Sequence, residues 1–127
     1  MRLNPIRVLV VDDDPLVAET LMLIFQRHGY DVAAANNADE ALREVRTTPP
    51  DLVLCDIDMP GRDGISLMMD VTHELPNCPI LVLTGFYSSL NRVQEYTSTL
   101  RQQVSVVTKP CQPLDLLRRV GELLRTA

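Results

Sequence analysis

Hydrophobic positions along the chain follow two alternating patterns. Short apolar runs, rich in β-branched residues and nearly free of polar interruptions, are typical of parallel strands buried on both faces. These runs are residues 7–11, 30–35, 51–56, 78–85 and 104–110. Between them, apolar residues recur at spacings of three and four, which predicts amphipathic helices. These helical segments are residues 15–28, a stretch within 36–50, residues 65–75 and the segment from residue 113 onward.

Residues at the segment ends support these boundaries. Asp14 before Pro15 is interpreted as a helix N-cap, since Asp at the N-cap with Pro at the first helical position is a common start. His28-Gly29 and the Pro-Pro pair at 49–50 are helix stops. Residues 88–103 are polar enough to form a surface helix, and Asp63 and Gly64 are interpreted as turn residues.

Five strands alternating with five helices predict a doubly wound α/β fold, a parallel sheet with helices on both faces. The 127 residues and 46% hydrophobic content suit one compact domain, which we expect to span 1–127 with residues 6–126 structured. In such folds the ligand site lies beyond the carboxyl ends of the strands. The residues at those ends are therefore the candidates for chemistry.

Acidic, hydroxyl and ammonium groups collect at the predicted strand ends. They are Asp12, Asp13 and Asp14 after the first strand, Asp56 after the third, Thr84 after the fourth and Lys109 after the fifth. Adjacent carboxylates repel one another, so they must lie in water or hold a cation. Clustered carboxylates suit Mg²⁺, and an Asp carboxylate can also act as a nucleophile toward a phosphoryl group. Asp56, a single acid at the end of a buried strand, is the best candidate nucleophile.

Composition narrows the possible partners. The net charge is −5 and no basic run occurs, which argues against nucleic acid or an anionic membrane as a direct partner. No apolar run reaches the roughly 18 residues needed to span a bilayer, and the N-terminus does not resemble a signal peptide, so we expect a cytoplasmic protein. The three cysteines fit neither a disulfide framework nor zinc-ligand spacing, and we expect reduced, mainly structural thiols.

Four motifs together resemble the receiver domains of bacterial response regulators, over essentially the whole chain. They are "VLVVDDDP", "DLVLCDIDMPGRDG", "LVLTG" and "VVTKP", in the order of that family. The resemblance implies a flavodoxin-like fold with strand order 2-1-3-4-5. It also implies a module of two-component signal transduction that receives a phosphoryl group from a sensor histidine kinase or phosphotransfer protein and acts on an effector domain or downstream protein.

The resemblance assigns roles to individual residues. Asp56 matches the phosphorylated aspartate, and Thr84 and Lys109 match the pair that binds the phosphoryl oxygens. Asp12 and Asp13 match the acid pair that holds Mg²⁺, Asp13 as a direct ligand and Asp12 partly through water. Asp58 matches the position whose backbone carbonyl binds the metal. Such a domain catalyses only its own phosphorylation and dephosphorylation.

The chain departs from the family pattern at several positions. Val106 and Cys111 stand where the family usually has aromatic residues, and Gly85 stands where it usually has Ala. Asp58 and Phe86 occupy positions that influence access of water to the phosphoryl group, so both should affect the lifetime of the phosphorylated state. The missing aromatic ring leaves open an alternative, a pseudo-receiver that binds partners without being phosphorylated.

A second alternative is an enzyme. The sequence "DIDMP" resembles the Asp-x-Asp motif of haloacid-dehalogenase-type phosphatases, in which the first Asp is the nucleophile. That family carries the motif on its first strand, whereas here it follows the third predicted strand. Turnover of a simple phosphomonoester would distinguish this enzyme from a receiver domain.

Overall fold

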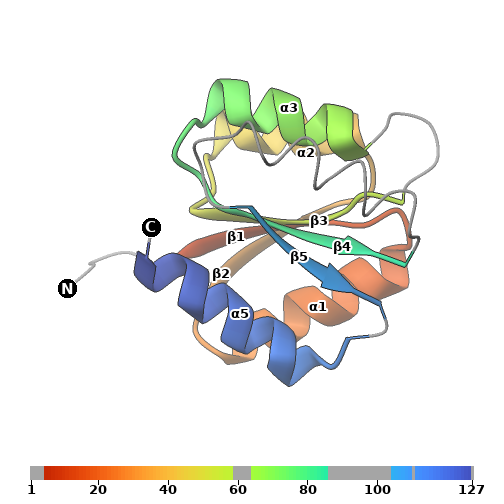
Figure 1. Ribbon diagram of the computed structural model, residues 1–127, viewed down its shortest axis with the longest axis vertical. Coiled ribbons are helices and arrows are strands. Elements are labelled where there is room, and N and C mark those ends of the chain that lie inside the picture. Colours follow the sequence, from red (N-terminus) through yellow and green to blue (C-terminus); the bar gives the residue numbers. More distant parts are fainter. Residues whose placement is uncertain (1–4, 59–63, 86–103, 110, 127) are drawn as a thin grey trace.

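A computed structural model describes residues 5–58, 64–85, 104–109 and 111–126. Within these residues, strands and helices alternate from residue 7 to residue 84, and a further strand and helix follow from residue 104 (Figure 1). The strands are β1 (Arg7–Val11), β2 (Asp31–Ala35), β3 (Leu52–Asp56), β4 (Ile80–Thr84) and β5 (Val104–Thr108). The helices are α1 (Pro15–Arg27), α2 (Ala38–Thr47), α3 (Gly64–Glu74) and α5 (Pro113–Thr126). The helix predicted over 88–103 lies outside the described residues.

The five strands form a parallel sheet in the order β2-β1-β3-β4-β5, which confirms the predicted doubly wound fold and its strand order. The central strands β3 and β4 are buried at every position, as their uninterrupted apolar runs predict. Because all strands run in the same direction, their carboxyl ends meet at one edge of the sheet. The chain reverses its direction of progress across the sheet between β1 and β3, and this edge is where such folds bind ligands.

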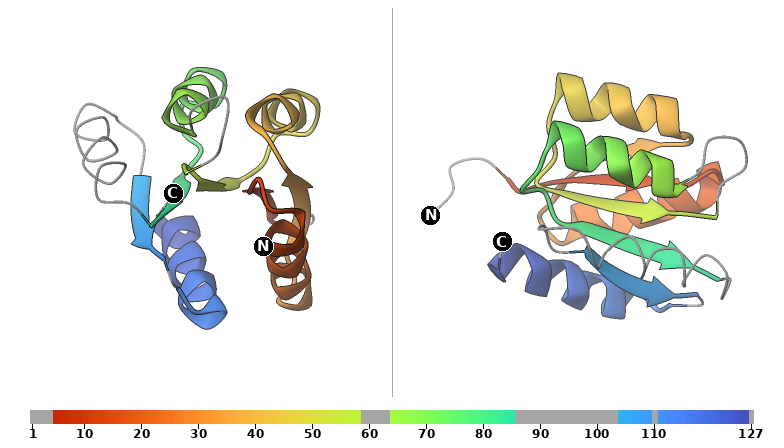
Figure 2. Two further views of the ribbon diagram at one scale, coloured as in Figure 1. Left: turned by 90° about the vertical axis from the view of Figure 1, so that its right-hand side faces the viewer. Right: turned by 45° about the horizontal axis from the view of Figure 1, so that its top comes forward.

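Two hydrophobic cores lie on opposite faces of the sheet. Alternate side chains of each strand point to opposite faces, so Leu9 and Val11 pack on one side while Val8 and Val10 pack on the other. The first face is covered by α2 and α3 and the second by α1 and α5 (Figure 2). The helices therefore cover the sheet from both sides and leave its carboxyl edge between them.

The helix starts follow the predicted capping chemistry. Asp14 caps α1 by accepting a hydrogen bond from the backbone N–H of Leu16 at 3.0 Å, with Pro15 as the first helical residue. Asn37 caps α2 in the same way through the N–H of Glu40 at 2.8 Å. Gly29 follows the end of α1 with φ of +89°, a conformation that favours glycine.

The interpretation of Gly64 as a turn residue is wrong, because Gly64 begins helix α3. A Cβ atom at this position would overlap the Cα of Ile57, just beyond the end of β3. Glycine is therefore needed for the close approach of α3 to the chain that leaves β3. Asp63 lies outside the described residues. Among the described helices, none is both long and apolar enough to cross a membrane.

Candidate phosphoryl-acceptor site

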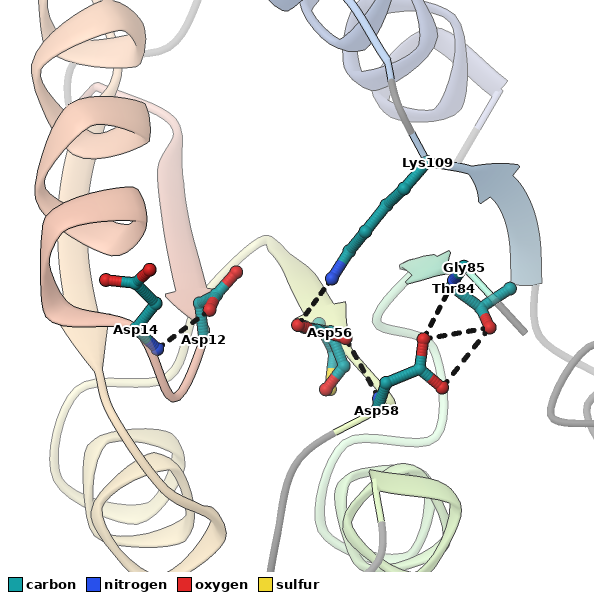
Figure 3. Close-up of polar contacts among 8 residues, drawn as sticks. Asp12, Asp14, Asp56, Asp58, Thr84, Gly85 and Lys109 are labelled. Atoms are coloured by element: carbon teal, nitrogen blue, oxygen red, sulfur yellow. Dashed lines mark hydrogen bonds and ion pairs between the residues drawn. The ribbon is translucent and has the colours of Figure 1, made fainter.

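Asp12 directly follows β1, and three hydrogen bonds to neighbouring residues hold it in place. Its N–H donates to the carbonyl of Ala35 at 3.0 Å, and its own carbonyl accepts from the side-chain amide of Asn36 at 3.1 Å. Its carboxylate Oδ1 accepts from the N–H of Asp14 at 2.9 Å. The side chain is buried, and the carboxylate therefore has a defined position at the mouth of the β1 to α1 turn (Figure 3).

Asp12, Asp13 and Asp56 form an acidic cluster. One carboxylate oxygen from each lies within 4.8 Å of the others, and Asp13 is exposed while the other two are buried. Burial raises the pKa of Asp12, and the negative charges of Asp56 and Asp13 raise it further, against the opposing effects of the Asp14 N–H and of Lys109. Such a cluster of hard oxygen atoms fits Mg²⁺, which commonly binds proteins through a few carboxylates.

Asp56 is the last residue of β3 and is only 3% exposed. Both of its carboxylate oxygens are engaged. Oδ1 accepts from the backbone N–H of Asp58 at 2.9 Å, and Oδ2 accepts from the ammonium of Lys109 at 2.7 Å. The strand end and these two donors orient the carboxylate toward the space between β1 and β5 (Figure 3).

Lys109 follows β5 and extends its side chain across the end of β4 to reach Asp56 (Figure 3). Its backbone N–H donates to the carbonyl of Thr84 at 2.9 Å, which continues the ladder between β4 and β5 by one residue. Burial alone would lower the pKa of Lys109, but the hydrogen bond to Asp56 and the charges of the surrounding aspartates raise it above its usual value. The side chain therefore stays an ammonium.

The Asp58 carboxylate reaches across to the end of β4. The hydroxyl of Thr84 donates to Asp58 Oδ2 at 3.1 Å and lies 3.3 Å from Oδ1, and the N–H of Gly85 donates to Oδ2 at 2.8 Å. Thr84 is the last residue of β4 and is 1% exposed. A buried hydroxyl and a backbone N–H thus both point at one negatively charged group.

A cavity of about 540 Å³ lies beside these residues at the carboxyl edge of the sheet. Its polar wall carries the acidic cluster, Asp58, Gly85 and Lys109. Its apolar wall is formed by side chains of α1, β4 and α5, namely Val17, Leu21, Leu83 and Leu116. The cavity thus places several carboxylates, an ammonium and a backbone N–H donor around one space, and these are the kinds of group that phosphoryl transfer requires.

The structure brings together the six predicted site residues: Asp12, Asp13, Asp56, Asp58, Thr84 and Lys109. The expectation that the Asp58 backbone carbonyl binds the metal stays a prediction. What the sequence did not indicate is the contact of the Asp58 carboxylate with Thr84 and Gly85, or the contact of Asn36 with Asp12. Asn36 directly follows β2, so its place at a strand end was the available signal. Phe86 lies outside the described residues.

The chain belongs to the response regulator receiver domain family, whose sequence profile matches residues 8–121. It is 34% identical over 124 residues to the transcriptional regulatory protein ResD of Bacillus subtilis, covering 98% of this chain and 50% of that protein. It is 37% identical over 119 residues to the DNA-binding response regulator MtrA of Mycolicibacterium smegmatis, covering 94% of this chain and 50% of that protein. The chain thus spans about half the length of these curated relatives.

Solved structures support the same assignment. A response regulator receiver domain protein (CheY-like) from Methanospirillum hungatei superimposes with a TM-score of 0.86 at 28% identity, covering 97% of this chain and 96% of that one. Membership of the receiver family and the position of Asp56 on the third strand argue against the phosphatase alternative. The protein is a receiver domain of the kind found in two-component response regulators.

Proposed function

We propose that this protein accepts a phosphoryl group on Asp56 from a sensor histidine kinase, a phosphotransfer protein or a small-molecule phosphodonor. The observation that carries the proposal is the environment of the Asp56 carboxylate. It is buried at a strand end, lies 2.7 Å from the Lys109 ammonium, shares a cluster with two further carboxylates, and faces a cavity. A structural acid needs its ion pair, but it needs neither the additional carboxylates nor the cavity.

The proposed transfer follows from these positions. An Asp56 carboxylate oxygen attacks phosphorus in a phosphohistidine of the partner, so that an acyl phosphate forms while the bond from phosphorus to the imidazole nitrogen breaks. The electron pair of that bond stays on the imidazole nitrogen, and because the other ring nitrogen of the phosphohistidine carries a proton, the histidine leaves as a neutral imidazole. Lys109 and the Thr84 hydroxyl then bind the oxygens of the transferred group, and Lys109 compensates its charge.

The donor set also fits a divalent cation. Asp12, Asp13 and Asp56 would hold Mg²⁺ through carboxylate oxygens, with the Asp58 backbone carbonyl as a further ligand. When bound, the ion supplies positive charge that offsets the charge on the transferring phosphoryl group. The chain's own contribution is to hold Asp12 in place through Asn36 and the N–H of Asp14.

Phosphorylation is proposed to change the binding of a downstream protein or an effector domain, in a bacterial cytoplasm. The described part of the site is formed within residues 8–121, and we propose that residues 6–126 act as one receiver domain that catalyses only its own phosphorylation and dephosphorylation. The relatives ResD and MtrA are named a transcriptional regulatory protein and a DNA-binding response regulator. This similarity supports an effector domain that regulates transcription.

The experiment that tests the proposal is incubation with acetyl phosphate and Mg²⁺, followed by intact-protein mass spectrometry. We expect the mass of one phosphoryl group to be added to the wild type and not to Asp56→Asn. Beryllofluoride binding, measured by calorimetry, should show the same difference. A wild type that neither gains mass nor binds beryllofluoride would overturn the phosphorylation proposal and favour the pseudo-receiver alternative. Sustained turnover of p-nitrophenyl phosphate would favour the phosphatase.

A further inference from the structure

The Asp58 carboxylate accepts hydrogen bonds from two donors at the end of a neighbouring strand. The Thr84 hydroxyl and the Gly85 N–H come from the end of β4, 26 and 27 positions away in sequence, and both donate to it. The distance from the Gly85 nitrogen to Asp58 Oδ2 is 2.8 Å, typical of a charge-assisted hydrogen bond. Figure 3 shows this carboxylate between β3 and β4, beside Asp56.

The backbone after β3 directs Asp58 to this place. The N–H of Asp58 donates to the Asp56 carboxylate at 2.9 Å, and the N–H of Ile57 donates to the carbonyl of Leu83 at 3.1 Å. These bonds turn the chain so that the side chain of Asp58 reaches Thr84. The backbone N–H of Asp58 therefore contacts the Asp56 carboxylate, while the side chain of the same residue contacts the end of β4.

The donors that hold Asp58 are suited to the oxygens of a phosphoryl group on Asp56. Thr84 is assigned to those oxygens in the proposed function, and Gly85 N–H points to the same anion as Thr84. Two negatively charged groups that share these donors repel each other, and because Thr84 is buried and Asp58 is partly buried, water screens this repulsion less than on the open surface. One of the two anions must then leave.

We propose that the Asp58 carboxylate is an internal competitor of the phosphoryl group. In the unphosphorylated protein it occupies Thr84 and Gly85, and it must leave them when Asp56 carries a phosphoryl group. This inference rests on the proposed function. Release of Asp58 breaks its hydrogen bonds to Thr84 and Gly85, so that occupancy of Asp56 is converted into a change at the ends of β3 and β4 without an aromatic residue at position 106.

The alternative is a purely structural role, in which Asp58 joins the ends of β3 and β4 in both states. The two roles differ in what removal of the carboxylate does. A structural link would lower stability and leave the affinity for a phosphoryl mimic unchanged or weaker. If the Asp58 carboxylate is a competitor, its removal increases the affinity for the phosphoryl mimic, whether or not the stability of the protein falls.

The test compares beryllofluoride affinity, at constant Mg²⁺, in the wild type, Asp58→Asn and Asp58→Ala. Loss of one charge-assisted competing contact predicts a gain of about tenfold for Asp58→Ala. Asp58→Asn keeps the shape and can still accept both hydrogen bonds without the charge, so its gain should be smaller. If Asp58→Ala fails to fold, the gain in Asp58→Asn alone decides the result, and equal or weaker binding overturns the proposal.

Two controls isolate the mechanism. Asp14→Asn removes a carboxylate from the same cavity but keeps an N-cap residue, so it measures the effect of charge alone and should change the affinity less than Asp58→Asn does. In a Thr84→Ala background the gain from Asp58→Ala should shrink, because the competition acts through that hydroxyl. An undiminished gain in that background would contradict it.

Failure of the proposed function gives a different pattern. If neither the wild type nor any Asp58 variant binds beryllofluoride or gains a phosphoryl group, the phosphoacceptor function itself is wrong. If all of them bind equally, only the competition is wrong. A direct measurement of the ground state is the amide proton of Gly85 in NMR spectra, which should move upfield in unliganded Asp58→Ala, because its charged acceptor is lost.

Discussion

The ammonium of Lys109 lies 2.7 Å from Oδ2 of Asp56, although 53 positions separate the two residues in sequence. One residue follows β5 and the other ends β3, and β4 lies between these strands. This ion pair places a positive charge against the cluster formed by Asp12, Asp13 and Asp56. The cluster therefore depends on Lys109 whenever no cation is bound.

Lys109→Gln should lower stability in the absence of metal. Its removal leaves the acidic cluster without a compensating ammonium, and we expect the free energy of unfolding in EDTA to fall by about 1 kcal/mol, because the Lys109 side chain is partly exposed. Added Mg²⁺ should stabilise this variant more than the wild type, since a competing positive charge is gone. Urea unfolding with and without Mg²⁺ measures both effects.

The matched control for that variant is Arg118→Gln, which breaks the exposed pair with Asp115 on α5. Exposed pairs contribute little, so its free energy of unfolding should change by less than about 0.5 kcal/mol. Equal effects of the two substitutions would mean that Lys109 does not compensate the acidic cluster.

Measurements of Mg²⁺ affinity should distinguish Asp13 from the adjacent Asp14. Asp13→Ala is expected to weaken Mg²⁺ binding by about tenfold or more, because it removes one of the three carboxylates proposed to hold the ion. Asp14→Ala should weaken it less and instead destabilise α1 by about 1 kcal/mol through loss of the N-cap. Calorimetric titration with Mg²⁺ gives the affinities, and the opposite order would show that Asp14 and not Asp13 is the ligand.

Chelation of Mg²⁺ should abolish phosphorylation by acetyl phosphate.

Replacement of glycine by alanine should change the free energy of unfolding in opposite directions in two helices. Gly64→Ala places a methyl group against the backbone of Ile57, and we expect a loss of about 1 to 3 kcal/mol in the free energy of unfolding. Gly121→Ala in α5 places its methyl group 3.7 Å from the flexible end of Arg125 and should stabilise by about 0.5 to 1 kcal/mol through helix propensity. Thermal denaturation of both variants tests this. A stabilising Gly64→Ala would show that α3 can move away from Ile57.

The three thiols should differ in reactivity. Burial raises the pKa of Cys78 to about 12, with the charge of Asp51 adding to the effect, and burial beside Asp56 and Asp12 raises the pKa of Cys55 as well. Both should resist a thiol reagent at pH 8 until the protein unfolds. Cys111 is partly exposed and should react in the folded protein despite a raised pKa. Mass spectrometry after brief labelling would reveal the order, and early labelling of Cys55 would contradict the packing of β3.

Much of the fold could be predicted because its signals are local. The strands and the described helices begin and end within a few residues of the predicted bounds, since an uninterrupted apolar run and a three-to-four spacing each reflect one kind of burial. Capping is local too, which is why Asp14 was correctly predicted. Gly64 was not, because the need for glycine there comes from Ile57, which approaches it through tertiary packing.

The sequence by itself determined which side chains stand at the strand ends, and hence that acids, a hydroxyl and an ammonium meet at one edge. Only the tertiary structure decided how they pair. Asp56 meets Lys109 because β3, β4 and β5 are neighbours in register, and the Asp58 carboxylate meets Thr84 because the turn after β3 directs it toward β4. Periodicity records which residues are buried, whereas the partner of a buried charge depends on strand order and on the path of each loop.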